Sequence, residues 1–515
     1  MTLGLPLKYG WLTVPLFWLI TLYGTHFGLD VAGLNLCAAI LLLWLFNPMR
    51  LNDNKCLWFG SIIAIIIALT FFISAHHWGV LMFALAEFIC FLLSDKKETD
   101  GIAFLIIALA AFANLSFITN TDIGAVQYDF LSCYNYIEYV MENHLMFWHE
   151  NPLLTRPSYS AYHPILHYLL AGFAVITGEA IGATKAAANE ALQVIITGYM
   201  LWYYVLCYKI LELCPFKSAI KLVLLAFIAL FPVYNAVAGF INNDCLLLPL
   251  QAGAIYYTLL YYINGGRKNL FFIWLFITLA SLTKLSGVLV LPMVGVALFL
   301  KLIKEKKQSI FWEEVIFGIA VLAGVALWPL YQYYVLHISA DFVPPQNHLA
   351  LTQFSFWERF SPLKAFIYER MFYDDYGENL WETLTKTALF GQWNFAVRGE
   401  KIMGLIPVMI LGYKLINALM ILAVAYLIIK SPDKKLTALF ITLLFGLLGG
   451  LIAFSVKHPF MCNQDFRYIA ILPLAYALIL GQFTEQMPPI FKRTTLVILS
   501  LFAALSCFIW FFVSR

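Results

Sequence analysis

Long apolar runs separated by short polar segments occupy almost the whole of this chain. An α-helix needs about 20 apolar residues to cross a bilayer, and most of these runs approach that length. The pattern therefore predicts about fifteen membrane-spanning helices. Their approximate ranges are 11–28, 31–47, 57–75, 79–94, 102–120, 188–208, 221–241, 245–263, 270–283, 286–303, 314–335, 403–428, 436–455, 468–484 and 494–512.

Two longer polar segments, 121–163 and 336–402, interrupt this pattern. The first follows directly on an apolar run and contains an amphipathic stretch. Its apolar side chains fall on one helical face and its polar side chains on another, which predicts a helix lying in the membrane interface with the apolar face down. The apolar face holds Phe130, Tyr134, Ile137 and Met141, and the polar face holds Asn135, Glu138 and Glu142.

The composition agrees with a lipid environment. The 515 residues are 62% hydrophobic and 12% charged, and the mean hydropathy is +0.82, whereas about a quarter of an ordinary soluble protein is charged. The predicted fold class is therefore an all-α polytopic membrane protein. A net charge of +3 gives no support for a nucleic-acid partner, and the nine cysteines are scattered singly without a zinc-ligand spacing.

Basic residues near helix ends mark the cytoplasmic side and give a topology. Seven basic clusters face the cytoplasm together if the region 270–303 is a hairpin of two short spans, with Thr283 and Lys284 at its outer tip. The apolar stretch after His163 must also not cross the membrane. The clusters are Arg50/Lys55, Lys96/Lys97, Lys209/Lys217/Lys221, Arg267/Lys268, Lys301/Lys304/Lys306/Lys307, Lys430/Lys434/Lys435 and Lys492/Arg493.

This topology places the N-terminus inside and makes the loops 121–163 and 336–402 external. The first loop carries five acids against one base, Arg156, which agrees with an outside location. The first apolar segment has no small-residue cleavage site, so we expect it to remain as an anchor. Short external loops and the lack of a retention signal favour a bacterial plasma membrane over the endoplasmic reticulum.

Carboxylates just above the hydrocarbon are costly to desolvate and are candidates for function. The stretch TNTDIGAVQYD contributes Asp122 and Asp129. Asp122 also fits a helix cap or a solvated loop acid. Asp129 lies in the loop that ends in YSAYHPILHYLLAG, where His163 and His167 are expected on successive turns. A carboxylate at the mouth of an apolar cavity is suited to act as a general base toward a hydroxyl acceptor.

Two polar islands follow between apolar runs. In GFINNDCLLLP, Asn243 and Asp244 fit either a helix cap or a functional site. In SLTKLSG, Lys284 breaks the positive-inside pattern, and so does Arg467, which precedes Tyr468 in MCNQDFRYIAILP. Both basic residues fit a bound lipid phosphate, and the alternative is snorkelling to the interface.

These motifs, in the order QYD, YIEY, YHPILHYLLAG, NNDCLLLPLQAGAIYY, TKLSGVLVLP and FRYIAILP, resemble those of the GT-C class of membrane glycosyltransferases. The closest likeness is to the protein O-mannosyltransferase-like family, which includes the lipid A aminoarabinose transferases. The resemblance covers roughly 100–480. It divides the chain into an N-terminal four-span extension (1–98), a GT-C-like core with the two external loops (99–485) and a C-terminal span (486–515).

The resemblance implies an inverting transfer of a sugar from a polyprenyl-phosphate donor, with no cofactor or metal required. It makes Asp129 the catalytic base and places Lys284 and Arg467 near the donor phosphate. It places the other candidates along the cavity or on its acceptor side. These are Asp122, His163, His167, Asn243, Asp244 and Tyr468.

Two departures from the family pattern, Tyr128 and Ile165, put the acceptor contacts in doubt. The acceptor stays open among protein, lipid and glycan. Two other hypotheses are a polymerase or ligase that uses a lipid pyrophosphate donor and a transporter of lipid-linked sugars. An arginine-rich external loop would favour the former, and internal repeats or helices broken near the bilayer midplane would favour the latter.

Overall fold

The computed structural model describes residues 98–119, 130–143, 159–337, 349–363, 377–391 and 404–513. The four N-terminal spans, Asp122 and Asp129 lie outside these residues. The described chain is all-α apart from one isolated β-bridge between Ala350 and Phe460. Among the described residues, six helices are long and apolar enough to cross a membrane, or seven if one bent pair is a single span. The described chain is therefore that of an all-α polytopic membrane protein.

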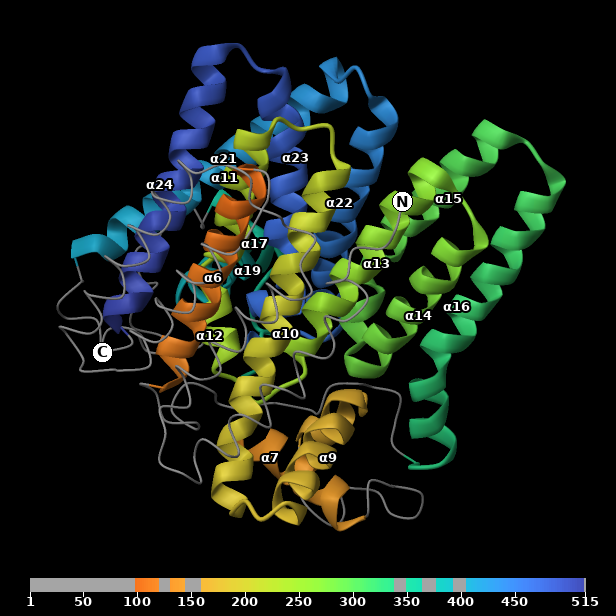
Figure 1. Ribbon diagram of the computed structural model, residues 1–515, viewed down its shortest axis with the longest axis vertical. Helices are drawn as coiled ribbons and strands as arrows, with labels where there is room; N and C mark the ends of the chain where they lie inside the picture. Colours follow the sequence, from red (N-terminus) through yellow and green to blue (C-terminus); the bar gives the residue numbers. More distant parts are fainter. Residues whose placement is uncertain are drawn as a thin grey trace.

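The helices pack side by side over most of their length (Figure 1). They are α6 (Glu98–Thr119), α7 (Phe130–Glu142), η2 (Tyr159–Tyr162), α9 (Leu166–Ala180), α10 (Lys185–Leu213), α11 (Ser218–Ala229), α12 (Val233–Ala238), α13 (Asp244–Asn264), α14 (Arg267–Thr283), η3 (Leu285–Val290), α15 (Leu291–Glu305), α16 (Gln308–Tyr334), α17 (Phe356–Phe360), α19 (Leu380–Phe390), α21 (Ile406–Lys430), α22 (Lys434–Lys457), η7 (Met461–Gln464), η8 (Phe466–Ile469), α23 (Leu472–Gln486) and α24 (Pro489–Val513).

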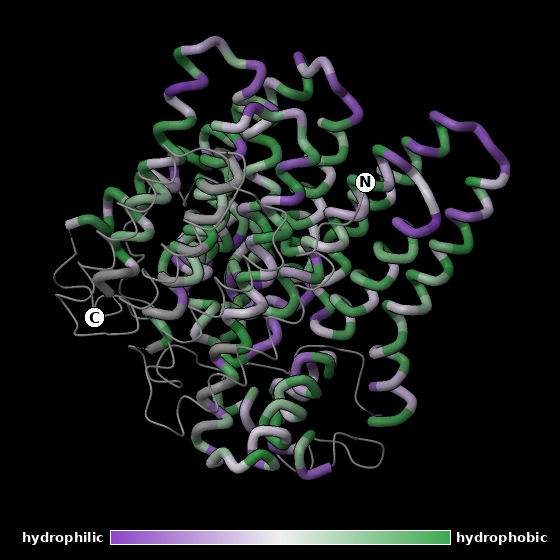
Figure 2. Tube along the Cα trace, viewed as in Figure 1, coloured by the Kyte–Doolittle hydropathy of each residue, from purple (hydrophilic) through white to green (hydrophobic). Residues whose placement is uncertain are grey.

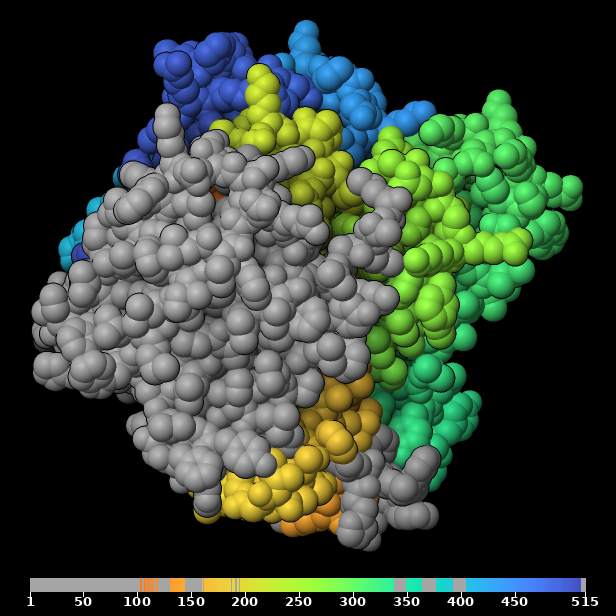
Figure 3. Space-filling view, in the orientation of Figure 1, coloured from red at the N-terminus to blue at the C-terminus, as the bar shows by residue number. Residues whose placement is uncertain are grey.

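Helix α13 lies at the centre of the bundle, and α16 lies at its edge. α13 packs against α10, α14 and α15, and nearly all of its side chains are buried. α16 packs mainly on α14 and exposes large apolar side chains such as Ile316, Ile319 and Leu322. Its side chains form one edge of the molecule in Figure 3. An apolar surface of this extent is stable only against lipid, so α16 faces the bilayer.

The basic loops that follow residue 200 gather at one end of the molecule. Figure 2 shows hydrophilic residues concentrated on the loops at its upper end. The backbone N–H of Lys217 donates to Glu485, and Lys492 pairs with the same carboxylate at 3.3 Å. Arg267 pairs with Glu313 at 2.8 Å, which joins the start of α14 to the start of α16. The positive-inside rule predicts that this end faces the cytoplasm.

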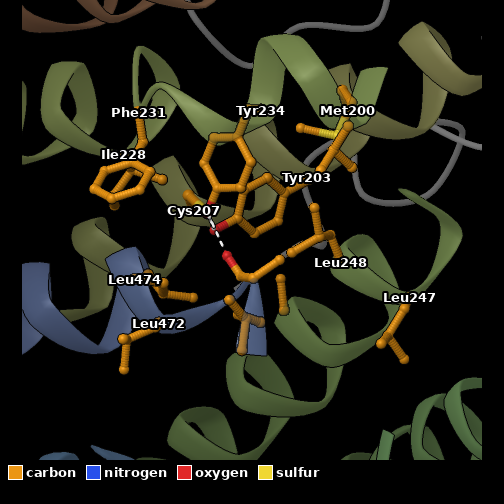
Figure 4. Close-up of a cluster of buried hydrophobic side chains, with 14 of the residues drawn as sticks. Met200, Tyr203, Cys207, Ile228, Phe231, Tyr234, Leu247, Leu248, Leu472 and Leu474 are labelled. Carbon is orange, nitrogen blue, oxygen red and sulfur yellow. Dashed lines mark hydrogen bonds between the residues drawn. The ribbon is translucent and has the colours of Figure 1, made fainter. Parts of the chain in front are cut away.

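The predicted span 221–241 is not one helix. It consists of α11 and α12, which are separated by a break at Leu230–Pro232. Proline lacks the backbone N–H that would continue the helix, and its ring disfavours helical geometry in the residue before it. After the break, Tyr234 enters a cluster of apolar side chains from α10, α11, α13 and α23 (Figure 4).

Tyr234 also ties this break to another one. Its hydroxyl lies 2.8 Å from that of Tyr203, and it donates to the carbonyl oxygen of Ala470 at 2.8 Å. Ala470 lies between η8 and α23, at the start of the span expected at 468–484, and the axis of the segment Met461–Ile469 differs in direction from that of α23 by 54°. Buried tyrosine hydroxyls need hydrogen-bond partners, and here these bonds hold α12 against the start of α23.

The predicted amphipathic helix is present as α7, but its buried face differs from the expected one. Cys133, Tyr136 and Val140 are buried, whereas Phe130 and Tyr134 are only partly covered. The reason is that α7 packs against α9, so that protein covers this face. α9 has 15 residues, about 22 Å at 1.5 Å per residue. It is too short to cross a bilayer of about 30 Å, in agreement with the expected non-crossing stretch after His163.

The hairpin predicted for 270–303 consists of α14, η3 and α15, and it depends on a glycine. A Cβ on Gly287 would lie 2.6 Å from the carbonyl carbon of Ala280, whereas a Cβ on Gly295 would meet nothing within 4 Å. Gly287→Ala should lower the free energy of unfolding by about 1–3 kcal/mol, since backbone must move. Gly295→Ala is the matched control and should be neutral or slightly stabilising. Equilibrium unfolding in micelles compares the two, and equal stabilities would contradict the prediction.

Candidate functional site

A buried ion pair joins two of the polar islands. The ammonium group of Lys284 donates to Asp244 Oδ1, and the two side chains are only 6% and 1% exposed. Asp244 is the first residue of α13, where the helix dipole favours a negative charge. Lys284 has an extended backbone between α14 and η3. Charged groups buried in a membrane protein are expensive and are candidates for function by default.

Two asparagines hold the ends of α13 and α14 together around this pair. Asn243 occupies the N-cap position of α13, but its side chain does not cap the helix. Its amide instead donates to the carbonyl oxygen of Thr283 at 2.8 Å, and Asn242 Oδ1 accepts from the backbone N–H of Asp244 at 3.0 Å. The island NND therefore supplies both a local bond at the start of α13 and a link to the last residue of α14.

The third island brings a second base and a second acid to the same place. Arg467 Nε lies 3.8 Å from Asp465 Oδ2, and Asp465 Oδ1 accepts from the backbone N–H of Arg467 at 2.9 Å. Both basic side chains lie against the ring of Tyr468, whose centroid is 4.5 Å from Lys284 Nζ and 5.8 Å from Arg467 Cζ. These distances are within the range of cation–π attraction. Lys284, Asp244, Arg467, Asp465 and Tyr468 are called the charged cluster below.

Part of the long loop 336–402 forms a buried helix, α19, that packs next to the charged cluster. α19 packs against α12, α21 and η8, and its residues are almost all buried. Thr387 of α19 accepts a hydrogen bond from the backbone N–H of Phe466 at 2.9 Å, next to Arg467. α19 belongs to the packed interior, so this part of the loop that was expected to be external is not a solvent-exposed segment. The aromatic stretch YERMFYDDY of the same loop lies outside the described residues.

The charged cluster lies at the opposite helix ends from the basic loops. Asp244 begins α13, Lys284 follows α14 and Arg467 precedes α23, and the other ends of these helices adjoin the basic loops. The helices have 21, 17 and 15 residues, which correspond to about 31, 25 and 22 Å. The longest of them, α13, matches the thickness of the hydrocarbon core, whereas α14 and α23 are shorter. Lys284 was expected at an outer tip, and it does lie at the turn, but its side chain is buried and paired.

His167 is buried on α9, with its ring against those of Tyr168 and Tyr199 at centroid distances of 5.3 and 6.5 Å. Burial lowers the pKa of His167 to about 4, and the nearby carboxylate of Asp244 opposes this shift. The imidazole is therefore neutral at pH 7. His163 lies before α9 begins, so the two histidines do not occupy successive turns of one helix, and His163 is partly exposed.

Acid should destabilise the protein through His167. Its pKa in the folded state lies below the unfolded value of about 6.5, so the unfolded state binds more protons between these values and stability falls as pH falls from 6.5 to 4. The full contribution is about 3 kcal/mol for a shift of this size. His167→Phe should lose less stability than wild type over this pH range, as measured by thermal unfolding. Parallel pH profiles for the two proteins would contradict this origin of the acid sensitivity.

The structure thus brings together most of the described residues that the sequence singled out. Lys284 contacts both Asp244 and Tyr468, Arg467 contacts Tyr468, and Asn243 links α13 to the end of α14 beside them. His167 is buried on α9, which packs against α10 as α13 does. Sequence analysis missed Asp465, although an acid two residues before a basic residue in a largely apolar region is a visible signal. It also missed the tyrosine link that fixes Ala470.

Within the described ranges, no three His, Cys, Asp or Glu side chains are grouped as a metal site requires. Compared with protein-family models and with curated proteins, the chain matches none.

Proposed function

We propose that this protein is an inverting glycosyltransferase that moves a sugar from a polyprenyl-phosphate donor to an acceptor at the extracytoplasmic face of a bacterial plasma membrane. The observation that carries the proposal is the buried Lys284–Asp244 pair beside Arg467 and Tyr468. Lys284 and Arg467 lie at the end of the bundle opposite the basic loops. Two cationic side chains in this position are suited to bind the phosphate of a lipid that enters from the membrane.

Lys284 can bind a phosphate even though its ammonium group is already paired with Asp244. Lys284 has three N–H donors, and among the described residues one of them is bonded to Asp244. An incoming phosphate would accept hydrogen bonds from the remaining N–H groups of Lys284 and would be attracted by the positive charge of Arg467. The carboxylates of Asp244 and Asp465 offset the charges of Lys284 and Arg467, which lowers the cost of burying both basic side chains.

The proposed reaction needs no group beyond the chain and its substrates. Asp129 accepts the proton of the acceptor hydroxyl or amine as that group attacks the anomeric carbon of the sugar. The bond between this carbon and the phosphate oxygen breaks, and the polyprenyl phosphate leaves with the electron pair. The configuration at the anomeric carbon is inverted. Lys284 and Arg467 stabilise the charge that develops on the phosphate.

The test is release of polyprenyl phosphate by purified protein from a panel of polyprenyl-phosphate sugars, with membrane extract as the source of acceptor. We expect release from one donor by wild type and by Lys304→Gln, since Lys304 is exposed at the basic end. Lys284→Gln should lose release. Thermal unfolding of both variants shows whether each is folded. Equal release by folded Lys284→Gln and wild type would remove the charged cluster from the reaction.

One observation favours a transporter as a second candidate. The bend of 54° between η7–η8 and α23 lies at the start of a predicted span, beside the buried charges of Asp465 and Arg467. Interrupted helices beside buried polar groups are typical of transporter binding sites. Reconstituted vesicles distinguish the two functions: a transporter moves the intact lipid-linked sugar between leaflets, whereas a transferase cleaves it. Movement without cleavage would replace the transferase proposal.

A further inference from the structure

Arg359 on α17 is a buried basic residue without an acidic partner. It is only 9% exposed, and its Nη2 donates to the carbonyl oxygen of Ser455 at 2.5 Å. Its Nε has no hydrogen-bond partner among the described residues. None of the ion pairs formed within the described ranges includes Arg359. A buried charge without an opposite charge and a buried nitrogen without an acceptor are both costly. Together they indicate an anionic ligand from outside the chain.

Hydrogen bonds to α17 hold Arg359 in place. The side-chain amide of Asn379 donates to the carbonyl oxygen of Glu358 at 2.9 Å. The indole N–H of Trp381 donates to the carbonyl oxygen of the last residue of α17 at 2.8 Å. The carboxylate of Glu358, the neighbouring acid, accepts from the backbone N–H of Ser355 at 2.8 Å in the capping box of α17. The position of the guanidinium group is therefore set by the protein before any ligand binds.

The contact with α22 gives the level of Arg359 in the membrane. Ser455 lies in the last turn of α22, at the end opposite Lys434 and the basic loops. With 24 residues, α22 is about 36 Å long, whereas the hydrocarbon core is about 30 Å thick. Its last turn therefore reaches the layer of lipid headgroups, on the side that the positive-inside rule assigns to the outside.

Two aromatic side chains next to Arg359 in α17 are exposed. Phe356 is 57% exposed and Trp357 is 74% exposed. Tryptophan is enriched at membrane–water interfaces, because its ring is apolar and its N–H is polar. Arginine is well suited to phosphate, which accepts several hydrogen bonds from a guanidinium group. A buried arginine beside exposed aromatic rings at the level of the headgroups therefore fits a lipid phosphate better than a soluble anion.

We propose that Arg359 binds the phosphate of an anionic phospholipid of the outer leaflet, with Phe356 and Trp357 against the lipid. The single negative charge of phosphatidylglycerol balances the charge of Arg359, whereas the ammonium group of a zwitterionic lipid weakens this attraction. The site differs from the charged cluster, where each basic residue lies near an acid, and it does not depend on the proposed function. The two sites are neighbours, because Phe454, next to Ser455, has its ring centroid 5.3 Å from that of Tyr468.

The test measures binding to the purified full chain in a neutral detergent by native mass spectrometry. The probes are phosphatidylglycerol, phosphatidylcholine with the same acyl chains, and inorganic phosphate. Wild type should bind phosphatidylglycerol more tightly than phosphatidylcholine, and Arg359→Gln should lose about tenfold in affinity for phosphatidylglycerol. Arg359→Lys keeps the charge and should recover part of the loss. Lys457→Gln removes an exposed charge at the same end of α22 and should bind as wild type does.

Thermal unfolding without added lipid gives an independent result. Arg359→Gln should unfold at the same temperature as wild type or a higher one, because a neutral amide replaces a buried charge that has no acidic partner. A large fall in unfolding temperature would show that Arg359 serves the fold and would overturn the inference. Equal affinity of wild type for the two lipids, or equal affinity of wild type and Arg359→Gln for phosphatidylglycerol, would also overturn it. Displacement of phosphatidylglycerol by inorganic phosphate would show a site for a soluble anion and would overturn the assignment to a lipid.

Discussion

Lys284→Met should destabilise the protein by about 3–5 kcal/mol, because it leaves the carboxylate of Asp244 buried without its partner. Methionine fills most of the volume of lysine, so the loss should come from charge rather than from a cavity. Equilibrium unfolding in mixed micelles measures the change. Lys304→Met, at an exposed position on the same hairpin, should change stability by less than about 0.5 kcal/mol.

A double-mutant cycle separates the pair from its individual members. Asp244→Asn alone leaves Lys284 without its carboxylate partner, in a cluster where Lys284 and Arg467 both contact the ring of Tyr468. The combination of Asp244→Asn with Lys284→Met removes both charges. It should therefore be more stable than Lys284→Met alone, with a coupling of about 1–3 kcal/mol. If the losses in free energy of unfolding are additive, the two side chains stabilise the protein independently and the ion pair itself contributes nothing.

The same pair shows why sequence analysis reached the helices more easily than the site. Apolar runs predicted α13 and α14 to within a few residues, since 18 or so apolar residues in a row admit few other structures. Asp244 and Lys284 were each singled out because charge is scarce in this chain. Their pairing was not visible, because contact between residues 40 positions apart depends on how α13 packs against α14.

The errors in the predicted spans have a different origin. A hydropathy window averages over about 19 residues, so it cannot register a short interruption inside an apolar run. Pro232 falls within the predicted span 221–241, and the bend after Ile469 falls at the start of the predicted span 468–484. The hydroxyl of Tyr234, just after Pro232, donates to the carbonyl oxygen of Ala470 at the second break, and Arg467 lies in η8 immediately before that break.

Asp129→Asn should abolish sugar transfer and leave folding unchanged, if Asp129 is the base of the proposed reaction. A carboxamide cannot accept the proton of the acceptor, and general-base catalysis is worth about 10²–10⁴ in rate. This expectation comes from the sequence and the family resemblance, because Asp129 lies outside the described residues. Single-turnover release of polyprenyl phosphate measures the rate. Glu142→Gln makes the same chemical change on the exposed end of α7 and should retain the wild-type rate.

The combination of Asp129→Asn with the donor-binding measurement assigns separate tasks to the two sides of the site. A base that acts only at the acceptor contributes nothing to donor affinity, so this variant should bind the lipid-linked sugar as wild type does while turnover is lost. Lys284→Gln, by contrast, should bind the lipid-linked sugar more weakly than wild type does. If Asp129→Asn instead weakens donor binding and leaves turnover of bound donor intact, Asp129 belongs to the donor site. The base would then have to be sought among the other acids of the loop 121–163.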